Sequence, residues 1–374
     1  MYTNGKSNTF YFFKGRIALY AILKAMGVKA GDEVIIPGFT CVVVPNAVLY
    51  LGAKPVYVDI EAHTYNINTK RIEEKITEKT KAIIAQHTFG IPAEMDKILE
   101  IAKKHNLYVV EDSCHAIGSK YKDQEVGTFA DAAFFSSQWS KPVTTGLGGW
   151  AIVNNPKIRE NMDKFIGEFT KPSFREIALL RLQYLLYEKL LTPSLFWFAQ
   201  TIYRKLYGSG IIKGSSSPEE LACKMPGDYK KLMSEWQGQI LQKKLKKIGA
   251  MIQHRKTMAG IYESHLKKVG LNPVSLPADY DTVFLRYPLA VKDKEKLLYL
   301  AKQERIELGD WFVSPVHPLK EEHLWRLAGY EKGMCPIAEE VCQHVINLPT
   351  HGKIKEKDAE KIVKFIRQNT QIRP

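Results

Sequence analysis

Cysteine is scarce in this chain of 374 residues, and its distribution argues against two classes of protein. The five cysteines are scattered, their number is odd, and none stands in a CxxC pair. Disulfide-stabilised secreted domains and zinc-binding modules require closely spaced, paired cysteines. We therefore expect a protein of the reducing cytoplasm.

Long uninterrupted hydrophobic runs are also missing. The first twenty or so residues contain no apolar stretch of the kind that forms a secretory signal, so we expect none. The most apolar segment, residues 175–208, is interrupted by charged residues and split at Thr192-Pro193 into two helical pieces. A membrane-spanning helix needs about 20 apolar residues in succession. Two alternatives stay open: a helical hairpin packed on its own domain or a subunit interface, and an amphipathic segment in peripheral contact with a membrane.

Negative charge is in short supply, because 54 Lys and Arg residues outnumber 40 Asp and Glu residues. The net charge of +14 favours acidic partners, which could be phosphorylated metabolites, nucleic acid or an anionic membrane. The sequence has no RNA-binding signature and no convincing helix-turn-helix. The basic run at 241–249 is most simply a solvated helix face. We expect no nucleic-acid partner.

From residue 16 to about 153 the sequence alternates short β-like runs with helical segments. This alternation predicts βαβ units and a mostly parallel sheet covered by helices on both faces. The predicted fold class is therefore α/β, with a large doubly wound sheet. Helices are predicted at 16–28, 40–52, 71–80 and 94–106, and strands at 32–38, 54–60, 81–88, 107–112, 132–138 and 148–155.

The rhythm breaks after residue 156 and resumes in the last hundred residues. A long helix is predicted from Ser234 to Lys268, and a smaller α+β unit follows it. In that unit we predict strands at 282–291 and 306–311, and helices at 293–305, 337–349 and 356–368. We divide the chain into a large domain at 1–245, with an apolar helical insert at about 170–226, and a small C-terminal domain at 246–374.

The strand predicted at 107–112 ends in two acids, Glu111 and Asp112. Side chains alternate along a strand, so only one of the two can face the crevice where parallel sheets bind ligands. Asp112 is either the N-cap of a helix or a buried carboxylate that faces a cationic ligand nitrogen.

Lys141 lies in a loop that begins with hydroxyls and ends in glycines, within FFSSQWSKPVTTGLGGW. A desolvated lysine has a lowered pKa, and its amine can then form a Schiff base with an aldehyde. A lysine in a polar glycine loop is more simply a surface residue. Its occurrence together with Asp112 makes the catalytic interpretation sharper.

A third element is the predicted helix start at Gly15. Free backbone N–H groups and the helix dipole form an anion site there, to which Arg16 could add donors, although an ordinary capped helix is the alternative. An anion site, a Schiff-base lysine and a carboxylate for a pyridinium nitrogen are the three requirements of pyridoxal 5'-phosphate (PLP) binding.

The order of these pieces resembles the DegT/StrS-type nucleotide-sugar aminotransferases, of PLP fold type I in the aspartate aminotransferase superfamily. Matching phrases include GRIALYAIL, GDEVIIPGFT, IAKKHNLYVVEDSCHAIGSKY and KPVTTGLGG. They cover most of 14–155 and, more loosely, 227–374. The resemblance implies a PLP-dependent transaminase that moves an amino group from an amino acid, typically glutamate, to a nucleotide-linked keto sugar. It also implies a homodimer and a role in making lipopolysaccharide, another surface polysaccharide or another amino-sugar product.

The resemblance also implies roles for single residues. Lys141 would bind PLP covalently and move the proton, Asp112 would pair with the pyridine nitrogen, and His115 would lie near the ring. His317 would lie near the mouth of the site and contact substrate, although a loop histidine without a role is the alternative; His87 we expect to be structural.

The phosphate of PLP would be held at the start of the first helix. By the resemblance, its ligands are Ser136 and the amides of Arg16 and Ile17, beside Gly15.

Four departures from the family pattern concern the cofactor and sugar pockets. Cys41 replaces an aromatic residue that stacks on PLP, Leu147 replaces an acid, and Lys230 replaces an asparagine that reaches the partner subunit's cofactor. The fourth is the long apolar insert. Retention of Lys141 favours transamination over dehydration or epimerisation of the same sugar, and a non-catalytic regulatory or membrane-associated member is the remaining alternative.

Overall fold

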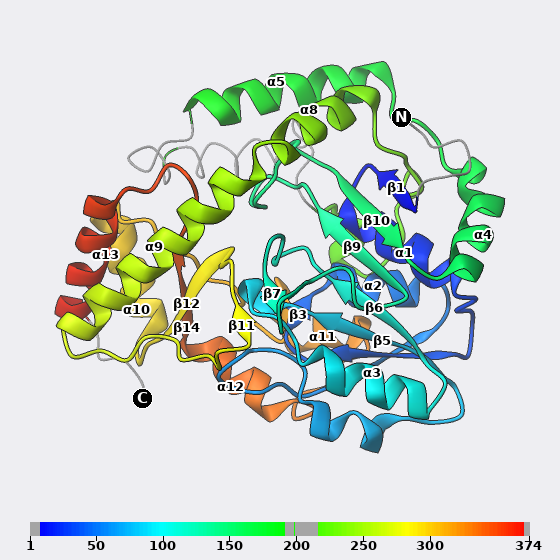
Figure 1. Ribbon diagram of the computed structural model, residues 1–374, viewed down its shortest axis with the longest axis horizontal. Helices are drawn as coiled ribbons and strands as arrows, with labels where there is room; N and C mark the ends of the chain where they lie inside the picture. Colours follow the sequence, from blue (N-terminus) through cyan, green and yellow to red (C-terminus); the bar gives the residue numbers. More distant parts are fainter. Residues whose placement is uncertain (1–7, 191–197, 199–215, 370–374) are drawn as a thin grey trace.

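The computed structural model describes residues 8–190, 198 and 216–369. A seven-stranded sheet in the order β1-β10-β9-β6-β5-β2-β4 forms the centre of the N-terminal part (Figure 1). Five of these strands, β4, β2, β5, β6 and β9, run parallel, whereas β10 and β1 are antiparallel to their neighbours. The α/β prediction is confirmed. The strands are β1 (Thr9–Phe12), β2 (Glu33–Pro37), β4 (Lys54–Val58), β5 (Thr80–Gln86), β6 (Tyr108–Asp112), β9 (Ala132–Ser136) and β10 (Gly149–Val153).

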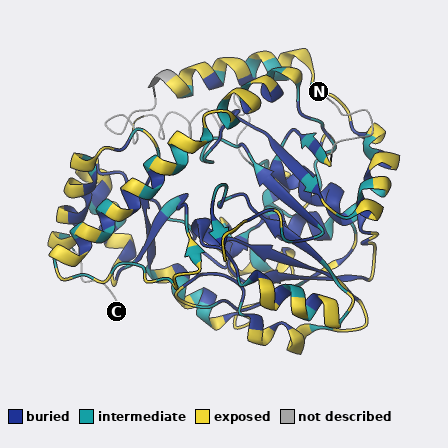
Figure 2. Cartoon of the chain, in the orientation of Figure 1, coloured by how far each residue is buried: buried dark blue, intermediate teal, exposed yellow. Residues whose placement is uncertain are grey.

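Helices cover both faces of this sheet, as the almost continuous apolar strands require. On one face, Val34, Ile36 and Ile84 pack into the core that includes α1 (Gly15–Ala25) and α2 (Val43–Leu49). On the other, Ile35 and Ile83 pack under α3 (Met95–Lys104). The buried sheet and the exposed outer sides of the helices are distinguished in Figure 2. A further helix, α4 (Pro156–Phe165), packs beside α1.

The C-terminal part is smaller and is built on an antiparallel pair, β12 (Arg286–Ala290) and β14 (Val345–Pro349). The long predicted helix at 234–268 is two helices with a break at Lys246-Lys247, and a capping box of Ser234 and Gln237 starts the first. Helix α8 (Glu235–Leu245) still packs on the large sheet, through Leu241 against β9 and β10. The helices of the C-terminal part are α9 (Ile248–Lys268), α10 (Lys294–Gln303), α11 (Glu322–Leu327), α12 (Pro336–His344) and α13 (Glu356–Asn369).

Three predicted elements are wrong in type. The helix predicted at 337–349 ends at His344, and its last five residues are strand β14, because a short buried apolar run does not reveal its period. The strand predicted at 306–311 is reduced to one bridge, Gly309 to Asn347. The helix predicted at 71–80 is replaced by two 3-10 turns, Thr69–Arg71 and Glu73–Lys75.

Short strands complete the framework and connect its two parts. β3 (Thr40–Cys41) pairs in parallel with β13 (Val316–His317), so a loop of the large sheet is bonded directly to the C-terminal part. Gly90 lies at a second junction, where a Cβ would approach Val283 O to 2.2 Å and φ is +103°. The remaining strands are β7 (Lys120–Tyr121), β8 (Gln124–Glu125) and β11 (Tyr280–Asp281).

The apolar insert begins with α5 (Phe174–Leu190), which packs on α8 through Tyr184 against Trp236 and an ion pair between Glu188 and Lys244. The second predicted helical piece lies outside the described residues, and α7 (Pro218–Leu221) follows. Among the described helices, none is long and apolar enough to cross a bilayer.

Candidate active site

Polar residues collect at the carboxyl edge of the parallel sheet. Asp112 ends β6 between two parallel neighbours, paired with Gln86 of β5 and Phe134 of β9. Ser136 ends β9 two residues farther along. The strands run in the same direction, so their last side chains meet at one edge. The predicted position of Asp112 and Ser136 at the carboxyl edge is therefore observed.

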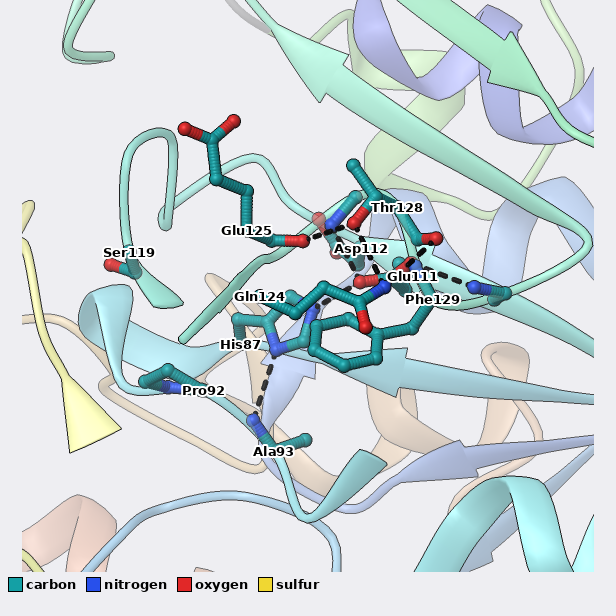
Figure 3. Close-up of polar contacts among 12 residues, drawn as sticks. His87, Pro92, Ala93, Glu111, Asp112, Ser119, Gln124, Glu125, Thr128 and Phe129 are labelled. Carbon is teal, nitrogen blue, oxygen red and sulfur yellow. Dashed lines mark hydrogen bonds and ion pairs between the residues drawn. The ribbon is translucent and has the colours of Figure 1, made fainter. Parts of the chain in front are cut away.

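The two consecutive acids of β6 point to opposite faces. Glu111 is fully buried and accepts hydrogen bonds from the N–H groups of Gly127, Phe129 and Ala130 at 2.5, 2.8 and 3.0 Å (Figure 3). His87 lies 3.2 Å from the same carboxylate. These bonds hold the 127–130 loop against the sheet, so Glu111 is a structural residue.

His87 has the structural place expected for it. Its Nδ1 accepts the Ala93 N–H at 3.0 Å, which leaves the proton on Nε2 for donation to Glu111 (Figure 3). Both ring nitrogens are thus occupied below the edge of the sheet.

Asp112 faces the other way, and its surroundings differ from those of Glu111. One oxygen accepts the Cys114 N–H at 3.0 Å, and among the described residues no lysine, arginine or histidine forms an ion pair with it. Burial raises the pKa of this carboxyl, while Cys114 and Lys141 oppose the rise. The N-cap alternative is wrong, because the residues after Asp112 form turns and no helix. A buried carboxylate without a cationic partner fits a protonated pyridine nitrogen.

Lys141 lies in the β9–β10 loop, and its backbone N–H donates to Gln138 O at 2.9 Å. Burial lowers the pKa of its amine, and Arg286 lowers it further, against the opposing influence of Cys114 and Asp112. The Nζ atom lies 5.2 Å from the centroid of the Trp311 ring. The lysine is therefore a desolvated amine beside a buried carboxylate, and the surface alternative is wrong.

Two glycines bring the start of α1 against Ser136. A Cβ on Gly15 would lie 3.0 Å from Ser136 Cβ, and a Cβ on Gly149 would lie 2.3 Å from Gly15 Cα. The start of α1 thus lies against Ser136 at the sheet edge, and its first-turn N–H groups suit a phosphate there. The Ile17 N–H already donates to Lys14 O at 3.2 Å, so of the two predicted amides that of Arg16 is the better placed.

The Arg16 side chain requires a correction. Its guanidinium is buried and donates to Glu220 at 2.7 Å and to Ser216 at 3.0 Å. Glu220 also pairs with Lys14 at 3.2 Å. The carboxylate neutralises the guanidinium, so the side chain is an anchor for the 216–221 segment rather than an additional donor to an anion.

Aromatic side chains and two histidines form the opposite wall. His115 stacks on Trp311 with ring centroids 5.5 Å apart, and its Nδ1 accepts the Phe89 N–H at 3.3 Å. His317 packs edge-on to Phe312 and accepts the Val313 N–H. Burial lowers the pKa of His115 well below its usual range and that of His317 to about 4, so both rings are neutral at neutral pH.

Cys41 lies within this site. It pairs with His317 across β3 and β13, and burial raises the pKa of its thiol while Arg16 and Lys141 oppose the rise. Gln86 anchors the preceding residues by donating to Phe39 O and bonding Thr40. The side chain in the aromatic position is thus a small neutral thiol between α1 and Lys141.

Leu147 is explained by the insert. It is 2% exposed and lines a cavity of about 150 Å³ together with Leu179 and Leu180 of α5. A Cβ on the neighbouring Gly146 would lie 2.8 Å from Leu180, and the Tyr187 hydroxyl donates to Trp139 O. Helix α5 therefore covers the loop of Lys141, and an acid at 147 would be buried against leucines.

Lys230 is not brought to this site within one chain. Its Nζ lies 3.9 Å from Glu168, which also binds Lys24 at 2.8 Å. Its role toward a partner subunit stays a prediction.

Two residues of the site escaped the sequence analysis. Trp311 forms the wall opposite Lys141, and Arg286 lies with its guanidinium 4.8 Å from the Trp311 ring centroid. The buried amine of Lys294 donates to Asp310 O, Phe312 O and Cys342 O and so holds the Trp311 loop. The only signal in the sequence was the clustering of aromatics in GDWF, which does not by itself indicate where the loop lies.

The comparison with family models matches residues 7–174 and 202–367 to the DegT/DnrJ/EryC1/StrS aminotransferase family. Over 154 residues, 41% of the chain is 44% identical to 42% of GDP-perosamine synthase from Escherichia coli O157:H7. Over 355 residues, 95% of the chain is 29% identical to 82% of UDP-N-acetyl-3-dehydro-alpha-D-glucosamine 3-aminotransferase from Acidithiobacillus ferrooxidans.

A solved structure shows the same fold. It is that of a protein from Streptococcus pneumoniae described as a sugar aminotransferase, in its PLP form. The TM-score is 0.74 at 21% identity, and the match covers 96% of this chain and 86% of that one.

Proposed function

The chain belongs to the DegT/DnrJ/EryC1/StrS aminotransferase family, and from this premise we propose that it transfers an amino group from an amino acid to a keto sugar carried on a nucleotide diphosphate. Glutamate is the expected donor, and an amino sugar for a surface polysaccharide is the expected product. The observation that carries the proposal is the half-buried Lys141, whose desolvated amine interacts electrostatically with the buried carboxylate of Asp112 at the carboxyl edge of the sheet.

The residues present fit PLP. Lys141 would hold it covalently, Asp112 would bind its ring nitrogen, and Ser136 with the first turn of α1 would bind its phosphate. When bound, the cofactor supplies an aldehyde that accepts the amino group and a ring that withdraws electrons. The S. pneumoniae structure in a PLP form supports this choice of cofactor.

The chain's own groups would then hold and move protons. Because burial lowers the pKa of Lys141, a larger fraction of its amine is neutral at neutral pH and can accept a proton from the donor's α-carbon. Asp112 would accept a hydrogen bond from a ring N–H, and the neutral His115 and His317 line the space without adding charge. Trp311 and Phe312 exclude water from the reacting atoms.

The names of two relatives and the net charge of the chain support a nucleotide-linked substrate. The two curated relatives carry GDP- and UDP-linked sugars in their names. The net charge of +14 would attract a diphosphate.

The proposal is tested with purified protein and PLP. We expect a yellow protein whose visible absorbance disappears when glutamate is added and returns with 2-oxoglutarate. Lys141→Ala should prevent both the stable colour and the cycle, whereas Lys189→Ala, a substitution in the insert, should not. Failure to bind PLP would overturn the proposal; a bound cofactor that no amino donor converts would favour dehydration or epimerisation, or a non-catalytic regulatory role.

We further propose that two copies associate. Lys230 lies away from Lys141 in its own chain, and the resemblance gives the residue at its position a role in the partner's site. Light scattering after size exclusion should give a dimer, and a monomer with full activity would contradict it.

We also propose a cytoplasmic protein that contacts the membrane surface through α5. All five cysteines are free, as a reducing compartment allows. The outer side of α5 exposes Phe174, Leu182 and Leu185 at 86, 56 and 55% (Figure 2), next to the exposed Arg181. Apolar side chains with basic neighbours suit an anionic lipid surface.

Vesicle flotation tests this contact. The protein should float with anionic vesicles, and the double substitution L182E/L185E should abolish flotation. Leu327→Glu, on the exposed side of α11, is the matched control. Flotation that the double variant retains would assign the contact to another surface.

A further inference from the structure

Arg286 begins β12 and points toward the site rather than away from it. Its guanidinium lies 4.8 Å from the Trp311 ring centroid, on the same indole that has Lys141 Nζ at 5.2 Å. A Cβ on Gly309 would lie 2.6 Å from Arg286 Nη1, so the glycine makes room for the guanidinium. The charge of Arg286 is close enough to lower the pKa of Lys141, His115 and His317.

Arg286 also has no anionic partner in the part of the chain that the structure describes. Within the described ranges no carboxylate forms an ion pair with it, and no hydrogen bond of its side chain is found. The two other arginines buried in this region differ: Arg16 is paired with Glu220, and Arg255 donates to Leu285 O and to Thr350. The half-buried guanidinium of Arg286 loses hydration that no described carboxylate, carbonyl or hydroxyl replaces, and an anionic ligand would replace it.

We propose that Arg286 binds a carboxylate of the amino-acid donor. This inference rests on the proposed transamination, because the donor must place its nitrogen next to Lys141. The donor's α-carboxylate is attached to the carbon that bears this nitrogen, so it must lie close to Lys141 as well. The planar guanidinium offers two parallel N–H donors to a carboxylate, and Trp311 holds it in a fixed orientation.

The arrangement separates the two substrates of the cycle. An amino acid carries its negative charge next to the reacting atoms, whereas a nucleotide-linked sugar carries it on the diphosphate. Arg286 should therefore matter for donor binding and donor specificity, and should have little effect on amines without a carboxylate.

The test uses the PLP-loaded enzyme and three variants. Glutarate is the binding probe, because it has carboxylates but no group that reacts with PLP. Arg286→Gln should weaken glutarate binding, measured by calorimetry, by about 10- to 100-fold, and should raise the glutamate concentration needed for the spectral change by a similar factor. Arg286→Lys should give an intermediate loss, because it keeps the charge without the fork. Arg181→Gln is the matched control, since Arg181 also lies over an indole, that of Trp236 at 5.5 Å.

A second probe distinguishes binding from a general structural effect. The rate of spectral change with butylamine, which has no carboxylate, should be the same in wild type and Arg286→Gln. Unchanged glutarate affinity in Arg286→Gln, or an equal loss of rate with butylamine and glutamate, would overturn the assignment of Arg286. If the enzyme bound no PLP, the proposed transamination would fall, while calorimetry with glutarate would still decide whether Arg286 binds a carboxylate.

Discussion

The neighbouring carboxylates on the two faces of β6 differ in how many hydrogen bonds they accept from the chain. Glu111 accepts three backbone N–H bonds and contacts His87, so every bond it needs is made within the chain. Asp112, the next residue, has one backbone N–H bond and no cationic partner among the described residues. Glu111 therefore maintains the fold, whereas the carboxylate of Asp112 is the one that we propose to bind the cofactor.

Glu111→Gln would disrupt the hydrogen bonds of the structural carboxylate and should have the largest effect on stability. The amide cannot accept from three N–H groups and His87 at once, because one of its atoms is a donor. We expect the free energy of unfolding to fall by about 3 kcal/mol or more. Chemical denaturation followed by circular dichroism measures it, and a loss below about 1 kcal/mol would contradict the structural role.

Asp112→Asn changes the carboxylate that we propose to bind the cofactor, and it should affect the reaction rate rather than stability. We expect stability to be unchanged or increased, because the substitution removes a buried charge whose pKa burial has raised. The rate of the glutamate half-reaction should fall roughly 100-fold or more, through loss of a buried charge pair with the cofactor ring. Stopped-flow absorbance measures the rate, and a stable variant with full activity would show that Asp112 does not serve the cofactor.

Leu147→Glu tests whether helix α5 packs closely on the loop that carries Lys141. The new carboxylate would be buried against Leu179 and Leu180 without a partner, and should destabilise the protein by about 2 kcal/mol. Thermal unfolding measures the loss. Leu147→Met, which keeps the volume, should stay within about 1.5 kcal/mol of wild type. Equal stabilities of the two variants would indicate that α5 does not cover residue 147 closely.

His317→Gln should have the smallest effect on stability at neutral pH, and its effect should appear only as the pH falls. Above pH 6.5 the histidine is neutral in both states; as the pH falls toward about 4, the unfolded chain binds a proton at His317 that the folded chain does not. The wild type therefore loses up to about 1.4 kcal/mol per pH unit in this window from this group. Denaturation at several pH values should show a shallower decline for His317→Gln, and an unchanged slope would contradict its buried, neutral state.

The sequence predicted the fold well where the pattern itself was unambiguous. Strands such as β6 and β9 and helix α1 follow from the alternation of apolar runs and breaks. Residues 345–349 were assigned to the wrong type because five buried residues in a row fit a helix or a strand equally well. The break at Lys246-Lys247 was not predicted, since no proline marks it and the nearby Gly249 lies inside helix α9.

The candidate site divides in the same way. Asp112 and Lys141 were found because one ends a predicted strand and the other lies in the loop after the next strand, whereas Ser136 was assigned through the family resemblance. Arg286 and Trp311 were missed because they come from the C-terminal part, and only the tertiary fold brings them to the sheet edge. The pairing of Arg16 with Glu220 was also missed, because 204 residues separate the two.

The insert at 170–226 could not be moved alone into a related protein. Both ends of the insert contact the candidate site. Leu180 and Tyr187 contact the loop of Lys141, and Glu220 forms an ion pair with Arg16. A relative that received residues 170–226 would therefore need Leu147 and Arg16 as well. Without Leu147 helix α5 would lose an apolar contact, and without Arg16 the buried carboxylate of Glu220 would lose a cationic partner. The modular unit is the segment together with these two contact residues, and it would have to be exchanged as one piece.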